Sequence, residues 1–464
     1  MTENFAGLLE AVARRRARAT ALAWQGGALT YTELDRRAGG VARRLAERGV
    51  HPGDVVALSL PNGWPFVAAL LGGLKLGATV MPLNPLLAAN ERRQVVDRLG
   101  PKLVIEESID AEADVVALPA TAPALILYTS GSTSEPKGSV LSHRALRAAN
   151  ESWAGPVMAL GETDTVLAVL PLAHSFGLNG ALLAPLLAGA RVCLMDRFTP
   201  EETLAAISTH HVSVLPAVAT MFRRLLDCPA LGAADLSSLR LALSGAAPCP
   251  WDIALGWRQR TGVRILRGYG MTELFRPISY LAADSVDVPE AIGRAVPGVA
   301  VRIADEEGGD CPDDQVGELW IKSPAALDEY LGAPEATRAA LHDGWFKTGD
   351  LAAVSPEGFV RIVGRKKDLI LRGGYSITPG EVEAVLLAHA AIAEAAVVGV
   401  PHSELGEDVA AFVVLRPGAA TDSTQLIAHC RERLAAYKSP RAVTILSELP
   451  KSATGKVLKS RLGA

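Results

Sequence analysis

The chain carries a polar loop at residues 128–138 with the sequence Tyr-Thr-Ser-Gly-Ser-Thr-Ser-Glu-Pro-Lys-Gly. It follows an apolar stretch, residues 124–127, that is typical of a buried strand. Such a loop can turn backbone N–H groups and hydroxyls toward one point, and its lysine adds positive charge, which suits a polyphosphate. A P-loop would end in Gly-Lys-Ser/Thr, whereas this loop ends in Pro136-Lys137-Gly138, so a P-loop NTPase is not expected. The candidate phosphate-binding residues are Thr129, Ser130, Gly131, Ser132, Thr133 and Lys137.

Length and composition narrow the function classes. The chain has 464 residues, of which 49% are apolar, so two or three domains with large cores are expected. Its net charge of −4 comes from well-mixed charges, and the concentrated basic face of a nucleic-acid-binding protein is not expected. The five cysteines are scattered without a Cys-x-x-Cys pair, which favours free thiols and a cytoplasmic location over disulfides or zinc.

No membrane span is expected. The best apolar stretch, residues 66–83, is interrupted by Lys75, several glycines and Pro82, and is shorter than the roughly 20 apolar residues a span needs.

From about residue 54 to 270, strand patterns alternate with helical patterns. Parallel sheets covered by helices follow from this alternation, and ligands then bind at loops beyond the carboxyl ends of the strands. The strand patterns are 55–60, 78–81, 165–170, 190–195, 212–215, 239–243 and 263–266, and the helical patterns are 65–76, 200–210, 218–226 and 250–261.

After about residue 290, glycines and prolines separate short strands, which predicts hairpins and a small barrel-like subdomain. Residues 364–368 are polar or flexible between apolar strands and predict a hinge at Lys367. We therefore expect an α/β protein with a large domain, residues 1–364, and a small mobile α+β domain, residues 365–464. The predicted elements of the small domain are helices 379–389 and 424–437 and strands 395–400 and 409–415.

A second motif, residues 268–273, reads Gly-Tyr-Gly-Met-Thr-Glu and follows a predicted strand. Gly268 and Gly270 let the backbone pass close to a ligand. Tyr269 can stack on a flat base, Thr272 can hydrogen-bond a phosphate oxygen, and Glu273 can hold Mg²⁺. The plain alternative is a turn at the end of a strand.

A third motif is Thr348-Gly349-Asp350. A carboxylate accepts two hydrogen bonds at once, so Asp350 suits the two hydroxyls of a ribose. Arg365 follows closely enough to reach the same ribose or a phosphate. The alternative is a capped turn, because Thr-Gly-Asp is common by chance.

Together these motifs resemble, in the same order, those of the adenylate-forming superfamily, in its acyl-CoA synthetase and aryl-CoA ligase branch. The resemblance runs from about residue 29 to 460 and implies a two-step reaction with ATP, Mg²⁺ and CoA as cofactors and substrates. In it, residues 450–457 carry the catalytic Lys456, and the loop at 244–248 places Gly245 and Ala246 beside adenine. It also implies that His174 gates the acid pocket, and that Gly373 and Gly374 meet the pantetheine thiol after a rotation at Lys367.

The acid is less constrained than the reaction. The resemblance places the substrate pocket at Phe176, Ala217, Val218, Ser244, Gly268 and Phe275, whose apolar or small side chains favour an aryl or medium-chain acyl group. No aspartate lies between residues 170 and 180, which argues against an α-amino acid. Gly268 stands where malonate-activating relatives carry arginine, which disfavours a dicarboxylate. Arg276 either binds a second polar group or forms a surface salt bridge.

Three functions share these motifs. The first is an acyl- or aryl-CoA ligase, the second an adenylation enzyme that loads a carrier protein, and the third a non-catalytic acyl- or nucleotide-binding protein. The oligomeric state stays open, with a homodimer as one alternative. One departure from the family pattern is Ser134, where the resemblance expects glycine; serine takes positive φ less readily, so loop mobility or ATP affinity would change.

Overall fold

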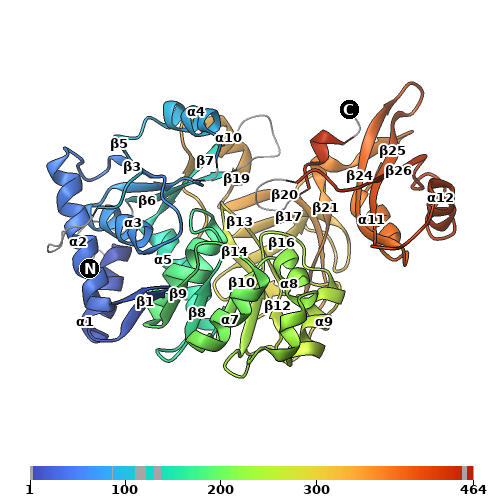
Figure 1. The fold of residues 1–464 in the computed structure, drawn as a ribbon. Helices are drawn as coiled ribbons and strands as arrows, with labels where there is room; N and C mark the ends of the chain where they lie inside the picture. The colour runs from blue at the N-terminus through green and yellow to red at the C-terminus, as the bar shows by residue number, and fades with distance from the viewer. Residues whose placement is uncertain (1–3, 86, 110–121, 130–136, 452–456, 463–464) are drawn as a thin grey trace. The chain divides into compact units, whose positions relative to one another are not determined.

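The computed structural model describes residues 4–85, 87–109, 122–129, 137–451 and 457–462 (Figure 1). By packing, the chain divides into two units. The first comprises Met1–Ala300 and Ile321–Phe346, and the second Val301–Trp320 and Lys347–Ala464. The domain boundary predicted between residues 364 and 365 is a statement about which part of the chain moves. The division by packing does not test it, so it stays a prediction.

A seven-stranded sheet forms much of the first unit within the described chain. All its strand pairs except β1–β2 are parallel, as the alternating pattern predicts. Its order is β12 (Ile265–Leu266), β11 (Leu241–Ser244), β10 (Val214–Ala217), β8 (Thr165–Ala168), β9 (Arg191–Leu194), β1 (Thr20–Trp24) and β2 (Gly27–Thr30).

Helices α7 (Pro200–His210), α8 (Ala219–Leu226) and α9 (Trp251–Thr261) lie along this sheet (Figure 1). They share one core with it, in which Ile207, Phe222 and Trp257 are fully buried against strand residues such as Leu215. Burying side chains of this size stabilises the fold by about 2 kcal/mol each.

A second sheet in this unit has six described strands. Strands β6, β4, β3 and β5 pair in parallel, whereas β6 and β7 pair antiparallel and stand on either side of the polar loop in the sequence. The order is β18 (Glu329–Tyr330), β7 (Lys137–Ser142), β6 (Pro123–Thr129), β4 (Thr79–Pro82), β3 (Val55–Leu58) and β5 (Leu103–Ile105). The loop thus leaves the carboxyl end of β6, where it was predicted.

The apolar stretch at 66–83 does not form one continuous helix. It forms helix α3 (Trp64–Leu76), which is buried on almost all sides, and then β4. Its one lysine, Lys75, is buried and pairs with Asp35 at 2.8 Å. No helix in the described ranges is both long and apolar enough to cross a membrane.

The other helical segments of the first unit surround these sheets. They are α1 (Phe5–Arg15), α2 (Tyr31–Glu47), α4 (Ala89–Leu99), α5 (His143–Ser152), η1 (Trp153–Val157), η2 (Gly177–Leu183), α6 (Ala184–Ala188), η3 (Pro229–Ala233) and α10 (Pro334–Ala340). Both η1 and η2 are π-helical, a rare conformation that is frequent at functional sites.

Two further sheets follow in the chain. A three-stranded sheet has the order β13 (Gly268–Met271), β14 (Phe275–Ser279) and β15 (Arg294–Ala295). A five-stranded sheet, mostly in the second unit, has the order β16 (Ala300–Ala304), β17 (Gly317–Lys322), β20 (Trp345–Val354) and β19 (Leu341–His342), with β21 (Val360–Arg365) on β20.

The end of the chain forms an α+β body around its own core, which includes Ile377, Val382, Val397 and Leu426. Its sheet has the order β23 (Tyr375–Ile377), β22 (Ile370–Arg372), β25 (Gly406–Leu415) and β24 (Ile392–His402), with β26 (Ala442–Leu446) on β25. Its helical segments are η4 (Lys366–Asp368), α11 (Pro379–Leu387), α12 (Ser423–Arg431) and η5 (Lys459–Arg461).

Candidate active site

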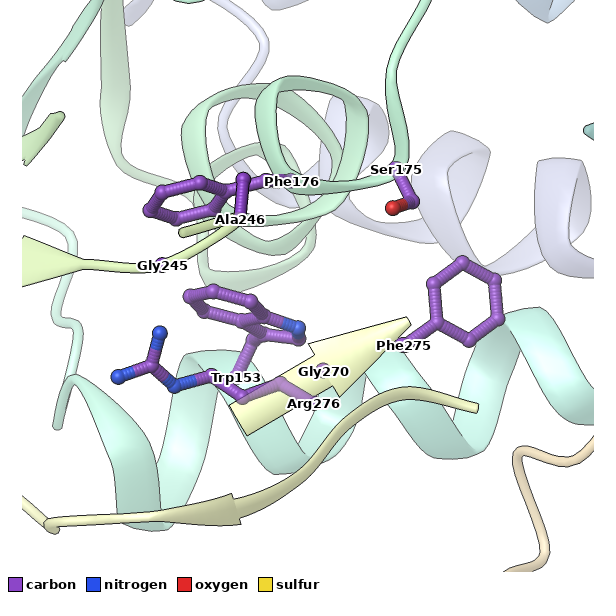
Figure 2. Close-up of a pocket in the computed structure, with 8 residues that line it drawn as sticks. All are labelled: Trp153, Ser175, Phe176, Gly245, Ala246, Gly270, Phe275 and Arg276. Carbon is purple, nitrogen blue, oxygen red and sulfur yellow. The ribbon is translucent and has the colours of Figure 1, made fainter. Parts of the chain in front are cut away.

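A pocket lies inside the first unit, at the ends of strands from two of its sheets (Figure 2). Four segments contribute to it: the start of η1, the turn before η2, the loop after β11, and the β13–β14 hairpin. Its lining residues are Trp153, Ser175, Phe176, Gly245, Ala246, Gly270, Phe275 and Arg276. Phe176, Gly245, Ala246, Gly270 and Phe275 among them are predicted site residues.

An aromatic pair forms one wall of the pocket. The rings of Trp153 and Phe176 stack with centroids 5.6 Å apart and planes inclined by 24°. Trp153 begins the π-helical segment η1, and Phe176 directly precedes the π-helical segment η2. A buried hydrogen bond, in which Asn150 Nδ2 donates to Asn179 Oδ1 at 2.8 Å, joins α5 to η2. This wall is flat and apolar, so it suits an aromatic or aliphatic group of a substrate.

Two lining residues have left-handed backbone conformations. Ala246 has φ 65° and Phe275 has φ 56°. Positive φ is uncommon for residues with a Cβ, and such strain tends to gather at binding and catalytic sites. The loop after β11 and the β13–β14 turn are therefore held in shape by their surroundings.

Glycine is required at two places in the β13–β14 hairpin. A Cβ on Gly270 would lie 2.0 Å from the carbonyl oxygen of Phe275. A Cβ on Gly268 would lie 2.4 Å from Cζ of Arg276. The hairpin can form this pocket edge only without side chains at these positions.

Arg276 is buried, so the surface salt bridge considered from the sequence is wrong. Its side chain is 5% exposed, and its guanidinium donates to Ser279 Oγ at 2.9 Å, to Ser244 O at 3.0 Å and to Leu266 O at 3.1 Å. The guanidinium also lies 5.1 Å from the centre of the Trp153 ring. Burial lowers the pKa of Arg276 to about 9, which leaves it mostly charged near neutral pH.

A chain of contacts joins the polar loop to Glu273. Lys137, at the base of the loop, has its Nζ 5.2 Å from the centre of the Tyr330 ring, and Tyr330 Oη donates to Glu273 Oε1 at 2.8 Å. Glu273 is 7% exposed, and its backbone oxygen accepts from the N–H of Leu327 at 2.8 Å. Burial and the adjacent Glu273 carboxylate raise the pKa of the Tyr330 hydroxyl, which therefore stays protonated as a donor.

Glu273 is the predicted metal ligand. Within the described part of the chain, no group of three or more His, Cys, Asp or Glu is placed to hold a metal ion. A Mg²⁺ ion keeps water and takes phosphate oxygens readily, so one carboxylate beside a bound nucleotide fits its needs. The chemistry of the residues present is therefore compatible with Mg²⁺ that arrives with ATP.

In the second unit, Asp350 and Arg365 face each other across β20 and β21. They are register partners, and Arg365 Nε lies 3.0 Å from Asp350 Oδ1. Asp350 is 6% exposed, and its backbone N–H donates to Thr348 Oγ1 at 3.0 Å. The two residues predicted to bind the ribose are thus adjacent, and the arginine orients the carboxylate.

The comparisons with known proteins identify the family. Residues 9–119 and 106–331 match the model of the AMP-binding enzyme family, and residues 381–456 match that of the AMP-binding enzyme C-terminal domain. The chain belongs to the AMP-binding enzyme family.

Relatives of this AMP-binding enzyme match it over nearly its whole length. A feruloyl-CoA synthase from Amycolatopsis is 37% identical, covering 97% of this chain and 96% of the relative. ATP-bound MatB from Rhodopseudomonas palustris has a TM-score of 0.95 at 31% identity and covers 100% of this chain and 98% of its own. A benzoate CoA ligase from Burkholderia xenovorans has a TM-score of 0.90 at 31% identity, with 100% of both chains covered. The expected family is therefore confirmed.

Several predicted residues of the AMP-binding enzyme lie beside the pocket rather than in its lining. His174 is near Asn84, with 3.5 Å between its Nε2 and Asn84 Nδ2, and burial lowers its pKa. Ala217 and Ser244 are buried strand ends, and Val218 precedes α8. Tyr269 Oη donates to Met271 Sδ at 3.7 Å, and Thr272 follows in the β13–β14 turn.

The remaining predicted site residues lie in other segments than the pocket lining or outside the described residues. Thr129 ends β6 opposite Lys137. Lys367 lies in η4, and Gly373 and Gly374 form the turn between β22 and β23 with φ of 56° and 87°. Ser130, Gly131, Ser132, Thr133, Ser134 and Lys456 lie outside the described residues.

Sequence reasoning missed three residues at the site. Trp153 and Ser175 line the pocket, and Tyr330 holds Glu273. Trp153 ends an amphipathic helix, so its pattern resembles an ordinary core residue. Tyr330 lies outside every motif and 57 residues from Glu273, and no local signal connects the two.

Proposed function

We propose that this chain is an AMP-forming acid–CoA ligase that works through an acyl-adenylate. The observation that carries the proposal is the contact chain from Lys137 through Tyr330 to Glu273, beside a pocket bounded by Phe275. This contact chain connects the loop at residues 128–138 with the buried carboxylate of Glu273, beside an apolar pocket, and all of them belong to the first unit. Similarity to a feruloyl-CoA synthase and a benzoate CoA ligase along the whole chain supports it.

In the first step, a carboxylate oxygen of the acid attacks the α-phosphorus of ATP. The new O–P bond forms as the bond to pyrophosphate breaks, and pyrophosphate leaves with the electron pair. Lys137 and the loop residues 129–133 bind the β- and γ-phosphates, while Thr272 and Lys456 stabilise charge on the α-phosphate. Such chemistry depends on positioning and charge stabilisation more than on bond-making groups.

Mg²⁺, when bound, neutralises phosphate charge, and Glu273 is the residue that would hold it. Tyr330 fixes the Glu273 carboxylate by the hydrogen bond at 2.8 Å. Partners of this kind orient metal ligands and are nearly as important as the ligands.

The nucleoside is bound by residues from several motifs. Asp350 accepts hydrogen bonds from the ribose hydroxyls. Arg365 orients the Asp350 carboxylate through the ion pair between the two residues. Tyr269 stacks on adenine, and the backbone of Gly245 and Ala246 lies along it. The left-handed conformation of Ala246 supports this, because it fixes the loop in a single shape.

In the second step, the sulfur of CoA attacks the acyl carbonyl as the thiol loses its proton to water. The C–S bond forms while the bond from the carbonyl carbon to the phosphate oxygen breaks, and AMP leaves with that electron pair. The C-terminal domain, residues 365–464, rotates at Lys367 between the two steps, so that Lys456 is withdrawn and Gly373-Gly374 meets the thiol. Lid and domain movements of this type serve successive steps in many enzymes. The support is local: Gly373 and Gly374 are exposed, and both adopt positive φ in a tight turn.

The acid is a compact aryl or medium-chain carboxylic acid, with His174 as its gate. The empty space at the pocket is about 350 Å³ even with the space open to solvent included. The Trp153–Phe176 stack favours a flat group there.

The experiment replaces Lys456 by alanine and measures adenylation and ATP binding separately. Lys456→Ala should lower the adenylation rate about 10²–10³-fold and leave ATP binding nearly unchanged. Lys451→Ala and Lys459→Ala are matched controls, since these lysines pair with Glu394 and Glu383 and should not affect the chemistry. Adenylation that survives in Lys456→Ala would show that the lysine has no catalytic role.

A further inference from the structure

Arg276 is a buried cation on β14, and it lines the pocket described above (Figure 2). Its three hydrogen-bond partners, Ser279 Oγ, Ser244 O and Leu266 O, are all neutral. Within the described ranges, no carboxylate forms an ion pair with it. The other buried arginine of this region, Arg267, also bonds to carbonyl oxygens, but it lies under Tyr280 and Trp251 and does not line the pocket.

The guanidinium keeps two hydrogen-bond donors. Arginine has five N–H groups, and three are used, one each on Nε, Nη1 and Nη2, so one N–H remains on Nη1 and one on Nη2. Nη1 lies next to Gly245, where a Cβ would be 3.1 Å from it. Both Gly245 and Arg276 line the pocket, and because Gly245 has no side chain, this donor lies next to the pocket space.

Burying a charge without a counter-charge is costly. The Trp153 ring, whose centre lies 5.1 Å from the guanidinium carbon, offsets part of that cost. Carbonyl partners offset more, but none of them carries a negative charge. A ligand that brings a negative charge next to the guanidinium of Arg276 would neutralise its positive charge. The remaining cost of burying that charge would be offset, and binding of such a ligand would be favoured.

The sequence suggested the opposite conclusion, because Gly268 stands where an arginine would mark dicarboxylate activation. The structure has a guanidinium against that same backbone position: a Cβ on Gly268 would lie 2.4 Å from Arg276 Nη2. The glycine at 268 therefore makes room for the side chain from β14.

We propose that Arg276 binds a second anionic oxygen group, a carboxylate or sulfonate, at the end of the acid remote from the activated carboxyl. This rests on the proposed function and narrows its substrate class to compact dianionic acids. Arg276 would be a specificity-determining residue: it contacts the substrate but takes no part in bond making. The two spare N–H groups suit a bidentate contact with such a group.

The test compares matched acids in ATP–pyrophosphate exchange. Hexanoate is paired with adipate, and benzoate with terephthalate and 4-sulfobenzoate, and kcat/KM is measured for each. In the wild-type enzyme, at least one dianionic acid should exceed its monoanionic match by about 30-fold or more. If the enzyme turns over monoanionic acids and none of the dianionic ones better, the proposal is overturned while the ligase function stands.

Variants then assign the preference to Arg276. Arg276→Met should reduce the ratio of dianionic to monoanionic kcat/KM to about 1, and Arg276→Lys should leave an intermediate ratio because a single ammonium keeps the charge without the fork. Arg294→Met is the matched control: Arg294 lies on β15, next to β14, its side chain is 46% exposed, and it pairs with Asp284 at 2.8 Å, so its loss should leave the ratio unchanged. If Arg276→Met does not fold, Arg276→Lys decides, and an unchanged ratio in Arg276→Lys would overturn the assignment.

Discussion

Tyr330 and Glu273 are 57 residues apart in sequence, yet the Tyr330 hydroxyl donates to the Glu273 carboxylate at 2.8 Å. The bond is made between the short edge strand β18 and the turn of the β13–β14 hairpin. Because Lys137 lies over the same tyrosine ring, Tyr330 connects the phosphate loop with the proposed metal ligand.

The first prediction concerns this hydrogen bond. Tyr330→Phe leaves the ring and its packing but removes one hydrogen bond that orients the Glu273 carboxylate, so the Mg²⁺ concentration for half-maximal adenylation should rise about 10–100-fold. A titration of activity with Mg²⁺ at saturating ATP measures it. Tyr31→Phe is the control, because Tyr31 also donates from a buried hydroxyl, to Ala190 O at 2.6 Å, but outside the site. An equal Mg²⁺ response in both variants would contradict the role given to Tyr330.

The second prediction concerns Gly270. In Gly270→Ala the new Cβ would collide with the carbonyl oxygen of Phe275, so the hairpin must shift and adenylation should fall at least about 10²-fold. The matched control is Gly7→Ala in α1, where a Cβ meets nothing within 4 Å and helix propensity should add about 1 kcal/mol of stability. Steady-state kinetics and thermal melts measure both, and normal kinetics in Gly270→Ala would show that the tight approach is unimportant.

The third prediction concerns pH and stability. Burial lowers the pKa of His143 to about 4, and its Nδ1 accepts from the Phe5 N–H. The unfolded state then binds a proton that the folded state does not, so stability from this group is complete above pH 6.5 and is lost as the pH falls toward 4. At pH 5 the loss relative to pH 7.5 should be about 2 kcal/mol.

Urea unfolding at pH 7.5 and pH 5 measures this term. His143→Gln keeps an acceptor but cannot be protonated, so its stability should fall less at pH 5 than that of the wild type. His51→Gln, at an exposed position, serves as the control. The same loss in His143→Gln as in the wild type would mean that other groups cause the acid sensitivity.

The fourth prediction concerns the nucleoside. Asp350→Asn removes the charge that pairs with Arg365 and one of the acceptors proposed for the ribose, so KM for ATP should rise about 10–100-fold with a smaller effect on kcat. Asp310→Asn is the control, since Asp310 is 74% exposed and pairs with Arg302 at 3.6 Å. Calorimetric ATP binding that is unchanged in Asp350→Asn would exclude the ribose contact.

Much of the fold could be predicted from local sequence. Helix α7 begins and ends where the pattern placed it, because Thr199 caps it, Pro200 is its first residue and Glu201 and Glu202 fill its first turn. Predictions failed where tertiary pairing decides. The strand predicted at 395–400 extends over Ile392–His402, because its antiparallel partner β25 pairs with it along that length. Helix α12 ends at Arg431 rather than Tyr437.

The site could be predicted in part, and for a physical reason. Motifs mark where the chain passes close to a ligand, since glycines and hydroxyls at strand ends are visible in the sequence. Trp153, Tyr330 and the burial of Arg276 depend on contacts between distant segments, and no local pattern encodes them. The barrel-like subdomain and the mobility of the C-terminal part stay predictions.

The central claim is that the chain joins a carboxylic acid to CoA through an acyl-adenylate. The most direct measurement follows AMP, pyrophosphate and CoA thioester together, with ATP, Mg²⁺ and a panel of aryl, aliphatic and dianionic acids, with and without CoA. The account predicts that one acid class releases pyrophosphate and that AMP and a thioester then appear in equal amounts once CoA is added. An adenylate that forms but is not discharged by CoA would contradict the ligase assignment, as would ATP binding without pyrophosphate release for any acid.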